Sequence, residues 1–245
     1  MKHSLRKELT MITRLFLIAI TPSIALGLAI YLADRYDREP TSLLIKMFVY
    51  GALTVIPVFF VEKLLLMLNV FPGILGIGYT AFVVAGFTEE YFKRLVVIKG
   101  AYNSKYFNEK LDGIVYCVFS SLGFATIENI MYVAFRFSGN YYVGIMRGIL
   151  SVPAHTLFAV TMGYYLSLAK YTEEPKLKRV YYSRSLIIPI LLHGLFNFIL
   201  MANVPFLMLL FIPYVIYLWR MNLIKLNKYT KESRDKFNRI NDDEI

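Results

Sequence analysis

Apolar blocks about 20 residues long recur along the chain, separated by short polar segments. A helix of that length crosses roughly 30 Å of hydrocarbon, at about 1.5 Å per residue. Backbone N–H and C=O groups in lipid must pair within the chain, so we expect each block to be a helix. The pattern predicts about seven to eight membrane-spanning helices, with seven placed at residues 11–33, 42–61, 73–98, 113–135, 142–169, 186–202 and 205–219.

The predicted fold class is therefore an all-α, multi-pass integral membrane helical bundle. The first block follows basic residues as a signal peptide would, but it is long and lacks a convincing cleavage site, so we expect a helix there. No internal repeat or linker interrupts the chain. We expect one membrane domain over residues 1–221 and a polar, basic C-terminal tail over residues 222–245.

Composition and charge agree with a membrane protein, since 57% of the 245 residues are hydrophobic and only 18% are charged. The net charge of +10 comes from Lys and Arg residues between the apolar blocks and in the tail. This distribution favours lipid headgroups over nucleic acid as the counter-charge. The single cysteine, Cys117, excludes an intrachain disulfide and a cysteine-rich zinc site.

Basic residues gather in alternate connections between the blocks, which the positive-inside rule places in the cytoplasm. These residues are Arg35, Arg38, Arg94, Lys99, Lys105, Lys110, Lys170, Lys176, Lys178, Arg179 and Arg184. Together with the basic tail they predict a cytoplasmic C-terminus. Seven spans would then put the N-terminus outside, whereas its own basic residues favour the inside; one span more or fewer would remove this conflict.

Ionisable residues inside the apolar blocks are the candidates for chemistry, because each costs a few kcal/mol to place in a membrane. They are Glu89, Glu90 and Lys93 on one predicted helix, Glu128 with Asn129 on the next, then His155, and then His193 with Asn197. Counting about 1.5 Å per residue puts these side chains at compatible depths. His193 and Asn197 are four residues apart and share a helix face. We therefore predict one intramembrane site built from four helices.

Each of these motifs also has a purely structural interpretation. Glu89, Glu90 and Lys93 can form an ion pair at a helix end, and polar contacts such as that of Glu128 can simply join helices. His155 can be a buried imidazole with satisfied hydrogen bonds. Polar packing rarely requires three carboxylates, a lysine and two imidazoles at one depth, which favours a functional site.

The residues in their chain order resemble a known family. Residues 89–93 read E-E-x-x-K, residues 123–129 read G-F-x-x-x-E-N from Gly123 and Phe124, His155 follows, and residues 193–197 read H-x-x-x-N. This order is similar to that of the PrsW family of intramembrane proteases, over about residues 11–219. The related CAAX prenyl endopeptidases and Abi proteins usually show E-E-x-x-x-R and F-x-x-x-H, so Lys93 and Glu128 favour the PrsW branch.

The resemblance implies a hydrolase, a membrane-embedded endopeptidase acting in intramembrane proteolysis. Its expected partner is a membrane-anchored protein, an anti-sigma factor that receives its first (site-1) cut in a bacterial stress response. The expected location is the bacterial cell membrane. A secondary transporter or proton-coupled channel is the alternative function, since intramembrane Glu, His and Lys residues also form ion relays.

Other intramembrane protease classes are disfavoured because the sequence lacks H-E-x-x-H, G-x-G-D and G-x-S-G. Without a Ser or Cys nucleophile, peptide hydrolysis needs an activated water. We expect Glu89 and Glu90 to activate it and Glu128, His155 and His193 to complete the catalytic site. Supporting roles are assigned to Lys93, Phe124, Asn129 and Asn197.

The cofactor is left open between two mechanisms that use the same residues. Catalytic zinc commonly takes three N or O ligands and keeps one position for water, which makes a subset of Glu89, Glu90, Glu128, His155 and His193 a candidate zinc site, for a metalloprotease. In a metal-free mechanism, glutamate and histidine alone activate the water.

Overall fold

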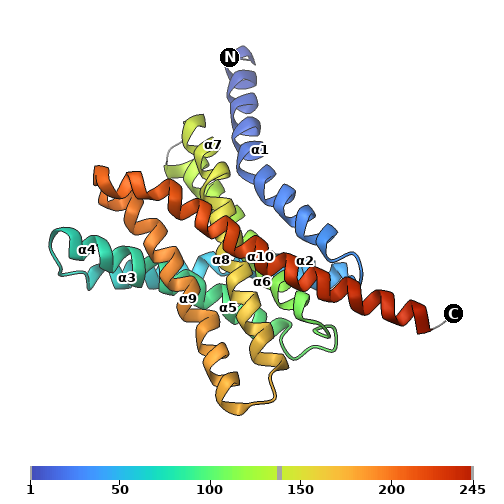
Figure 1. Cartoon of the computed structure of the whole chain (residues 1–245). Coiled ribbons are helices and arrows are strands. Elements are labelled where there is room, and N and C mark those ends of the chain that lie inside the picture. Colours follow the sequence, from blue (N-terminus) through green and yellow to red (C-terminus); the bar gives the residue numbers. More distant parts are fainter. Residues whose placement is uncertain (1, 137–139, 244–245) are drawn as a thin grey trace.

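The structure is a computed structural model that describes residues 2–136 and 140–243, and all regular structure in these ranges is helical. The elements are α1 (Lys2–Ala33), α2 (Thr41–Leu53), α3 (Val55–Met67), α4 (Gly73–Tyr79), η1 (Thr80–Phe87), α5 (Thr88–Gly100), α6 (Lys110–Met131), η2 (Tyr132–Arg136), α7 (Tyr141–Ile149), α8 (Ser151–Tyr171), α9 (Pro175–Ala202) and α10 (Pro205–Asp243). Figure 1 shows α10 crossing the bundle as one long helix, with α3 and α4 projecting together on one side. The prediction of an all-α bundle is confirmed.

Six helical segments within the described residues are long and apolar enough to cross a membrane. They are Thr13–Ala33, Thr41–Met67, Lys110–Met131, Tyr141–Tyr171, Pro175–Ala202 and Pro205–Asp242. The expected span at residues 73–98 is not among them, although α4, η1 and α5 follow one another there without a break. Its second half carries four charged residues, Glu89, Glu90, Lys93 and Arg94, which lower its hydropathy.

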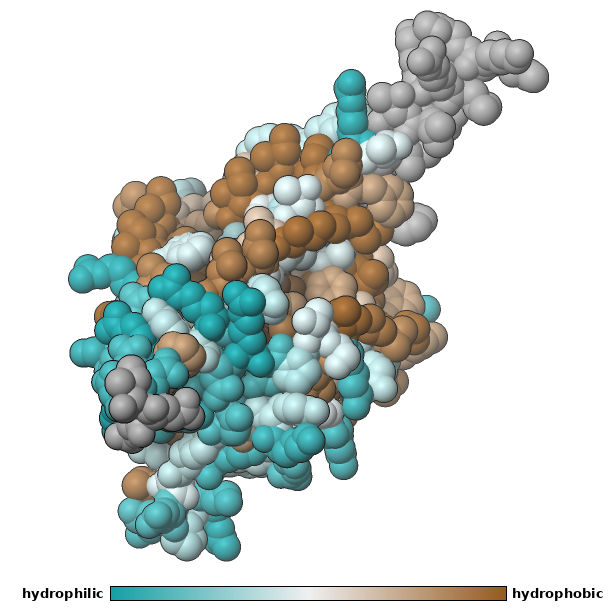
Figure 2. Space-filling view, turned by 90° about the vertical axis from the view of Figure 1, so that its right-hand side faces the viewer, coloured by the Kyte–Doolittle hydropathy of each residue, from teal (hydrophilic) through white to brown (hydrophobic). Residues whose placement is uncertain are grey.

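Large apolar side chains point outward from the bundle, as lipid contact requires. Leu17, Phe60 and Leu209 are 60–70% exposed, and they lie on three different membrane-spanning segments. Figure 2 shows the hydrophobic side chains gathered over one broad part of the surface and the hydrophilic ones gathered over another. This separation fits a protein whose middle is solvated by hydrocarbon and whose end is solvated by water.

The centre of the bundle is α6. Some 72% of its apolar window is buried, against 17% of that of α10, which lies at the periphery. Apolar side chains of α6, including Ile114 and Leu122, pack with Val152 and Leu166 of α8 in the main core. The buried polar residues of α6 therefore lie among helices and not in lipid.

Glycines set how closely α6 approaches its neighbours. A Cβ built on Gly163 of α8 would lie 2.2 Å from the backbone oxygen of Gly113 on α6, and one built on Gly123 would lie 1.9 Å from the backbone oxygen of Phe48 on α2. Small residues let membrane helices come into backbone contact. These contacts fix the distances between the helices that carry the site.

We expect Gly163→Ala to lower the stability of the protein by roughly 1–3 kcal/mol, because the added methyl group must push α8 away from α6. The measurement is the melting temperature of the detergent-purified protein. Gly78→Ala is the matched control, since the nearest atom to its new Cβ lies at 3.9 Å, an ordinary contact distance. Equal melting temperatures for the two variants would show that the helix contact is not tight.

Helices extend beyond the predicted apolar blocks, most of all at the start of α9 and the end of α10. Helix α9 begins at Pro175, well before residue 186, so Lys176, Lys178 and Arg179 lie on its first turns and not in a loop. Helix α10 continues past the apolar block through the polar tail to Asp243. Hydropathy detects where a helix enters water, not where it ends, which explains both differences. The division at residue 221 stays a prediction.

Candidate active site

The two adjacent glutamates of the site lie where η1 passes into α5. Thr80–Phe87 is π-helical, a conformation that adds a residue to each turn and is frequent at functional sites. Glu89 and Glu90 follow in the first turn of α5, and both are buried (5% and 0% exposed). Close packing brings α9 against η1, since a Cβ on Gly86 would lie 3.1 Å from the backbone oxygen of Ile190.

Lys93 lies among the acidic and imidazole groups. Its Nζ atom is 2.9 Å from Oε2 of Glu89, 2.9 Å from Oε1 of Glu90 and 3.0 Å from Nδ1 of His155. The same ammonium lies 4.3 Å from the centre of the Phe124 ring, in a cation–π contact. The side chain is 1% exposed. Lys93 therefore compensates two buried carboxylates at once.

The contacts of His155 define its tautomer. An ammonium can only donate hydrogen bonds, so Nδ1 of His155 accepts from Lys93. The proton of the neutral ring is then on Nε2, which donates to Oε2 of Glu128 at 3.1 Å. Ser121 of α6 donates to the backbone oxygen of His155, which ties the two helices together at this level.

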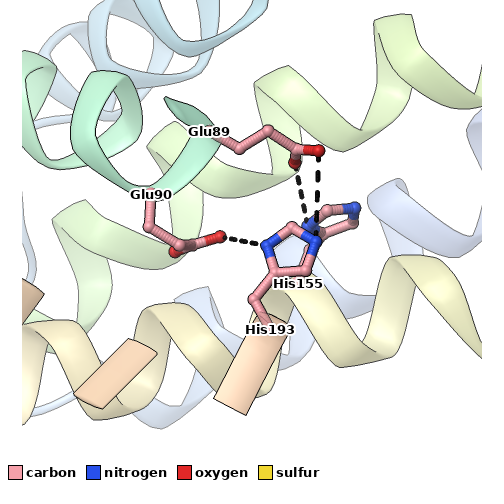
Figure 3. Close-up of side chains that lie close together, drawn as sticks. All are labelled: Glu89, Glu90, His155 and His193. Carbon is pink, nitrogen blue, oxygen red and sulfur yellow. Dashed lines mark hydrogen bonds and ion pairs between the residues drawn. The ribbon is translucent and has the colours of Figure 1, made fainter. Parts of the chain in front are cut away.

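The contacts of His193 leave one of its nitrogens open. Nδ1 lies 2.9 Å from Oε1 of Glu90, and because a carboxylate accepts, Nδ1 carries the proton. Nε2 is then an acceptor, and it lies 4.0 Å from Oε1 of Glu89. Figure 3 shows both imidazoles beside the Glu89 carboxylate, with Glu90 reaching His193 from the other side. Two acceptors cannot bond to each other, but at 4.0 Å apart both can accept from one bridging water.

A cavity of about 990 Å³ opens onto this cluster. Glu89, His155 and His193 line it, as do Phe124, Glu128 and Asn197, whereas Glu90 and Lys93 do not. The two adjacent glutamates thus differ in environment: Glu89 faces the cavity, and Glu90 is enclosed between Lys93 and His193. The cavity has room for an extended peptide segment beside the Glu89 carboxylate.

Among the predicted site residues, Asn129 lies apart from the cluster. Its amide Nδ2 donates to the backbone oxygen of Ala19 on α1, and its Oδ1 accepts from Nε of Arg147. Asn129 therefore holds α1 and α7 against α6 and does not face the cavity. Asn197 lines the cavity one turn beyond His193, and Phe124 lies beneath the ammonium of Lys93.

Four charged residues of the cavity wall are not among the predicted site residues: Glu62, Lys63, Arg136 and Arg147. Arg147 of α7 forms an ion pair with Glu128 at 2.8 Å and lines the cavity with it. Glu62 and Lys63, near the middle of α3, are also part of the wall. Each of these charges lies in or beside an apolar block, so the same criterion of membrane cost identifies them.

The cluster fits a metal in its donor atoms. Glu89, Glu90, His155 and His193 each offer one ligand atom, and these atoms all lie within 4.8 Å of one another. Such nitrogen and oxygen donors suit zinc. Oε2 of Glu90 is buried and accepts no hydrogen bond from the described residues, which leaves a donor atom available. Lys93, which already binds three of these four side chains, would compete with a metal for their lone pairs.

A helical membrane bundle with buried glutamates and histidines facing an internal cavity defines a class, the membrane-embedded hydrolases that use no Ser or Cys nucleophile. Comparisons with known proteins lead to a particular family. The family model described as "PrsW family intramembrane metalloprotease" matches residues 39–219. The chain belongs to the PrsW family and is an intramembrane protease.

Relatives named "Protease PrsW" cover most of the chain. The one from Clostridioides difficile (strain 630) is 47% identical over 225 residues, 91% of this chain and 94% of the relative. The one from Bacillus subtilis (strain 168) is 37% identical over 211 residues, 85% of this chain and 92% of the relative. The one from Shouchella clausii (strain KSM-K16) is 35% identical, with 89% and 97% covered. No solved structure gives a significant match to the chain.

Proposed function

We propose that this protease hydrolyses a peptide bond within the cavity with a water held between Glu89 and His193. The single observation that supports this is the 4.0 Å separation of Oε1 of Glu89 from the acceptor Nε2 of His193, both on the cavity wall. A water there donates one hydrogen to each acceptor and directs a lone pair toward the substrate carbonyl. This placement converts a bimolecular attack into a nearly unimolecular one.

In this mechanism Glu89 is the general base. It takes a proton as the water oxygen bonds to the carbonyl carbon, and it returns that proton to the leaving amide nitrogen when the C–N bond breaks. Glu90 fixes the tautomer of His193 by accepting from Nδ1, while Lys93 stabilises the two neighbouring carboxylates. His155 accepts a hydrogen bond from Lys93 and is itself held by Glu128, and Asn197 is available to polarise the carbonyl.

A metal is compatible with the same residues. Zinc would be held by a subset of Glu89, Glu90, His155 and His193, where it would supply Lewis acidity and a more acidic bound water. Glu128 lies outside this four-residue group and is held by His155 and Arg147. Metal analysis of the purified, active protein separates the two mechanisms, because only one of them requires a stoichiometric metal.

The proposed substrate is a membrane-anchored protein, and more specifically an anti-sigma factor cut at site 1 in regulated proteolysis. An internal cavity flanked by lipid-exposed helices suits a transmembrane or juxtamembrane segment. The relatives are bacterial proteins named as proteases, which supports a bacterial cell membrane as the location. The basic α10 supports a cytoplasmic C-terminus.

The test is reconstitution of the purified protein in liposomes with a single-pass substrate that carries an extracytoplasmic domain. We expect a new product band, with the cut position given by mass spectrometry. His193→Ala is expected to lower the rate about 10²-fold, because the water loses one of its two acceptors. Cys117→Ala is the matched control and should keep full activity, since Cys117 is buried in the α6 core.

The transporter alternative predicts a different result in the same liposomes. Ion flux that Glu89→Gln abolishes, without any product band from a panel of single-pass substrates, would contradict the proposed hydrolysis.

A further inference from the structure

A second group of buried carboxylates lies far from the active site. Asp34 follows α1 directly, and Glu109 and Asp112 lie at the start of α6. One ligand oxygen of each lies within 4.8 Å of those of the other two. Asp112 and Glu128 are separated by about 24 Å along α6, so this group cannot belong to the catalytic cluster.

Two of these carboxylates are buried with an oxygen that has no partner. Asp34 and Asp112 are both 0% exposed. Oδ2 of Asp34 accepts from the backbone N–H of Glu39, and Oδ2 of Asp112 accepts from the backbone N–H groups of Asn108 and Glu109. The Oδ1 atom of each accepts no hydrogen bond from any described residue. A buried charged oxygen without a partner is costly, so a positive charge or a proton is needed there.

The positive charge near the group falls short of the negative charge. Among the described residues, Lys236 of α10 forms an ion pair with this group, since its Nζ lies 3.9 Å from Oε2 of Glu109. The same Nζ lies closer to Oδ2 of Asp37, at 2.9 Å. Glu39, 5% exposed, adds another carboxylate nearby, where it accepts from the hydroxyl of Tyr116. One lysine shared in this way leaves a net negative charge in a buried place.

We propose that Asp34, Glu109 and Asp112 bind one divalent, oxygen-preferring cation such as Ca²⁺ or Mg²⁺. The donors are all carboxylate oxygens, which such cations prefer over nitrogen or sulfur. A spread of no more than 4.8 Å between ligand atoms is compatible with two Ca–O bonds of about 2.3–2.6 Å. A +2 charge would offset two of these carboxylates, which Lys236, shared with Asp37, leaves without a full counter-charge.

The cation would join two parts of the chain, the connection after α1, where Asp34 lies, and the start of α6, with Glu109 and Asp112. Lys236 of α10 reaches the same place through its ion pair with Glu109. The site thus links the end of one span, Thr13–Ala33, to the start of another, Lys110–Met131, on the side that the charge pattern predicts to be cytoplasmic. Protons are the competing way to neutralise it, since burial raises the pKa of Asp34 to about 8 and that of Glu39 to about 7.

The experiment uses the full-length protein, purified in detergent, treated with EDTA and dialysed. Equilibrium dialysis with radioactive CaCl₂ should show one bound ion per chain, and MgCl₂ is tested by competition. CaCl₂ at about 100 times the dissociation constant should raise the melting temperature by roughly 5 °C. Asp34→Asn and Asp112→Asn should abolish both the binding and the shift.

Glu90→Gln is the matched control, because it removes a candidate ligand of the active site and leaves the second group intact; its Ca²⁺ binding should equal that of the unmodified chain. Should either Asn variant fail to fold, Glu109→Gln, at the edge of the group, gives the same comparison. Binding that Glu90→Gln abolishes, or that all three carboxylate variants keep, would overturn the proposal. No binding of either ion at about 10 mM, roughly ten times the dissociation constant of the weakest calcium sites, would overturn it too and leave protons as the neutralising charge.

Discussion

Glu89→Gln is expected to lower the rate of substrate cleavage by roughly 10³–10⁴-fold, near the upper end of what general acid–base catalysis contributes. The amide has nearly the same shape but cannot take a proton from water. Oε1 of Glu89 is the carboxylate oxygen that faces His193 and the cavity, whereas Oε2 is held by Lys93. The measurement is the initial rate of product formation in liposomes, at equal amounts of folded protein.

Glu232→Gln is the matched control for this loss. It makes the same chemical change in a carboxylate that also pairs with a lysine, Lys110, but both side chains are about 40% exposed. An exposed ion pair contributes about 0–1 kcal/mol, so activity should be unchanged. If Glu89→Gln retained more than a tenth of the activity, Glu89 would not be the base, and Glu90 or a metal-bound water would have to take that role.

Lys93→Met is expected to destabilise the protein by roughly 3–5 kcal/mol, the usual cost of leaving a buried charge unpaired. Here two carboxylates, Glu89 and Glu90, lose the ammonium that lies 2.9 Å from each. His155 also loses the donor to its Nδ1. A large fall in melting temperature and in the amount of protein recovered from membranes is the expected result.

Lys110→Met is the control, because it removes a lysine from an exposed pair with Glu232. The triple variant Lys93→Met, Glu89→Gln, Glu90→Gln should regain much of the lost stability, since it leaves no charge to compensate. If Lys93→Met melted like the unmodified protein, the ammonium would contribute nothing to holding the two glutamates.

The fold and the main members of the site were accessible from sequence because both follow from the cost of polar groups in lipid. Apolar blocks of fixed length predict helices, and the few ionisable residues within them, such as Glu89 and His193, are exceptions that require a reason. The structure brings the predicted glutamates and histidines within contact distance of one another. Their catalytic roles stay predictions.

The sequence could not show which way each side chain faces around its helix, or which side chains pair between helices. The π-helical turns of η1 rotate everything that follows, and no hydropathy pattern reveals them. Helical periodicity alone therefore could not say that Glu89 faces the cavity and Glu90 is enclosed. Asn129 was grouped with Glu128 by adjacency, but one residue of rotation turns it toward α1. Arg147, the partner of Glu128, lies on a different helix, so only the packing discloses the pair.

Three helices meet in one set of short polar contacts: Lys93 of α5 binds His155 of α8, and Glu90 of α5 binds His193 of α9. Helices in a bilayer tilt when its hydrocarbon thickness departs from their apolar length. A slide of α5 by about 2 Å against the other two would stretch both contacts beyond bonding distance. The thickness of the surrounding membrane should therefore help to hold the proposed catalytic groups in register, and lipids of different acyl-chain length are expected to change the rate of turnover.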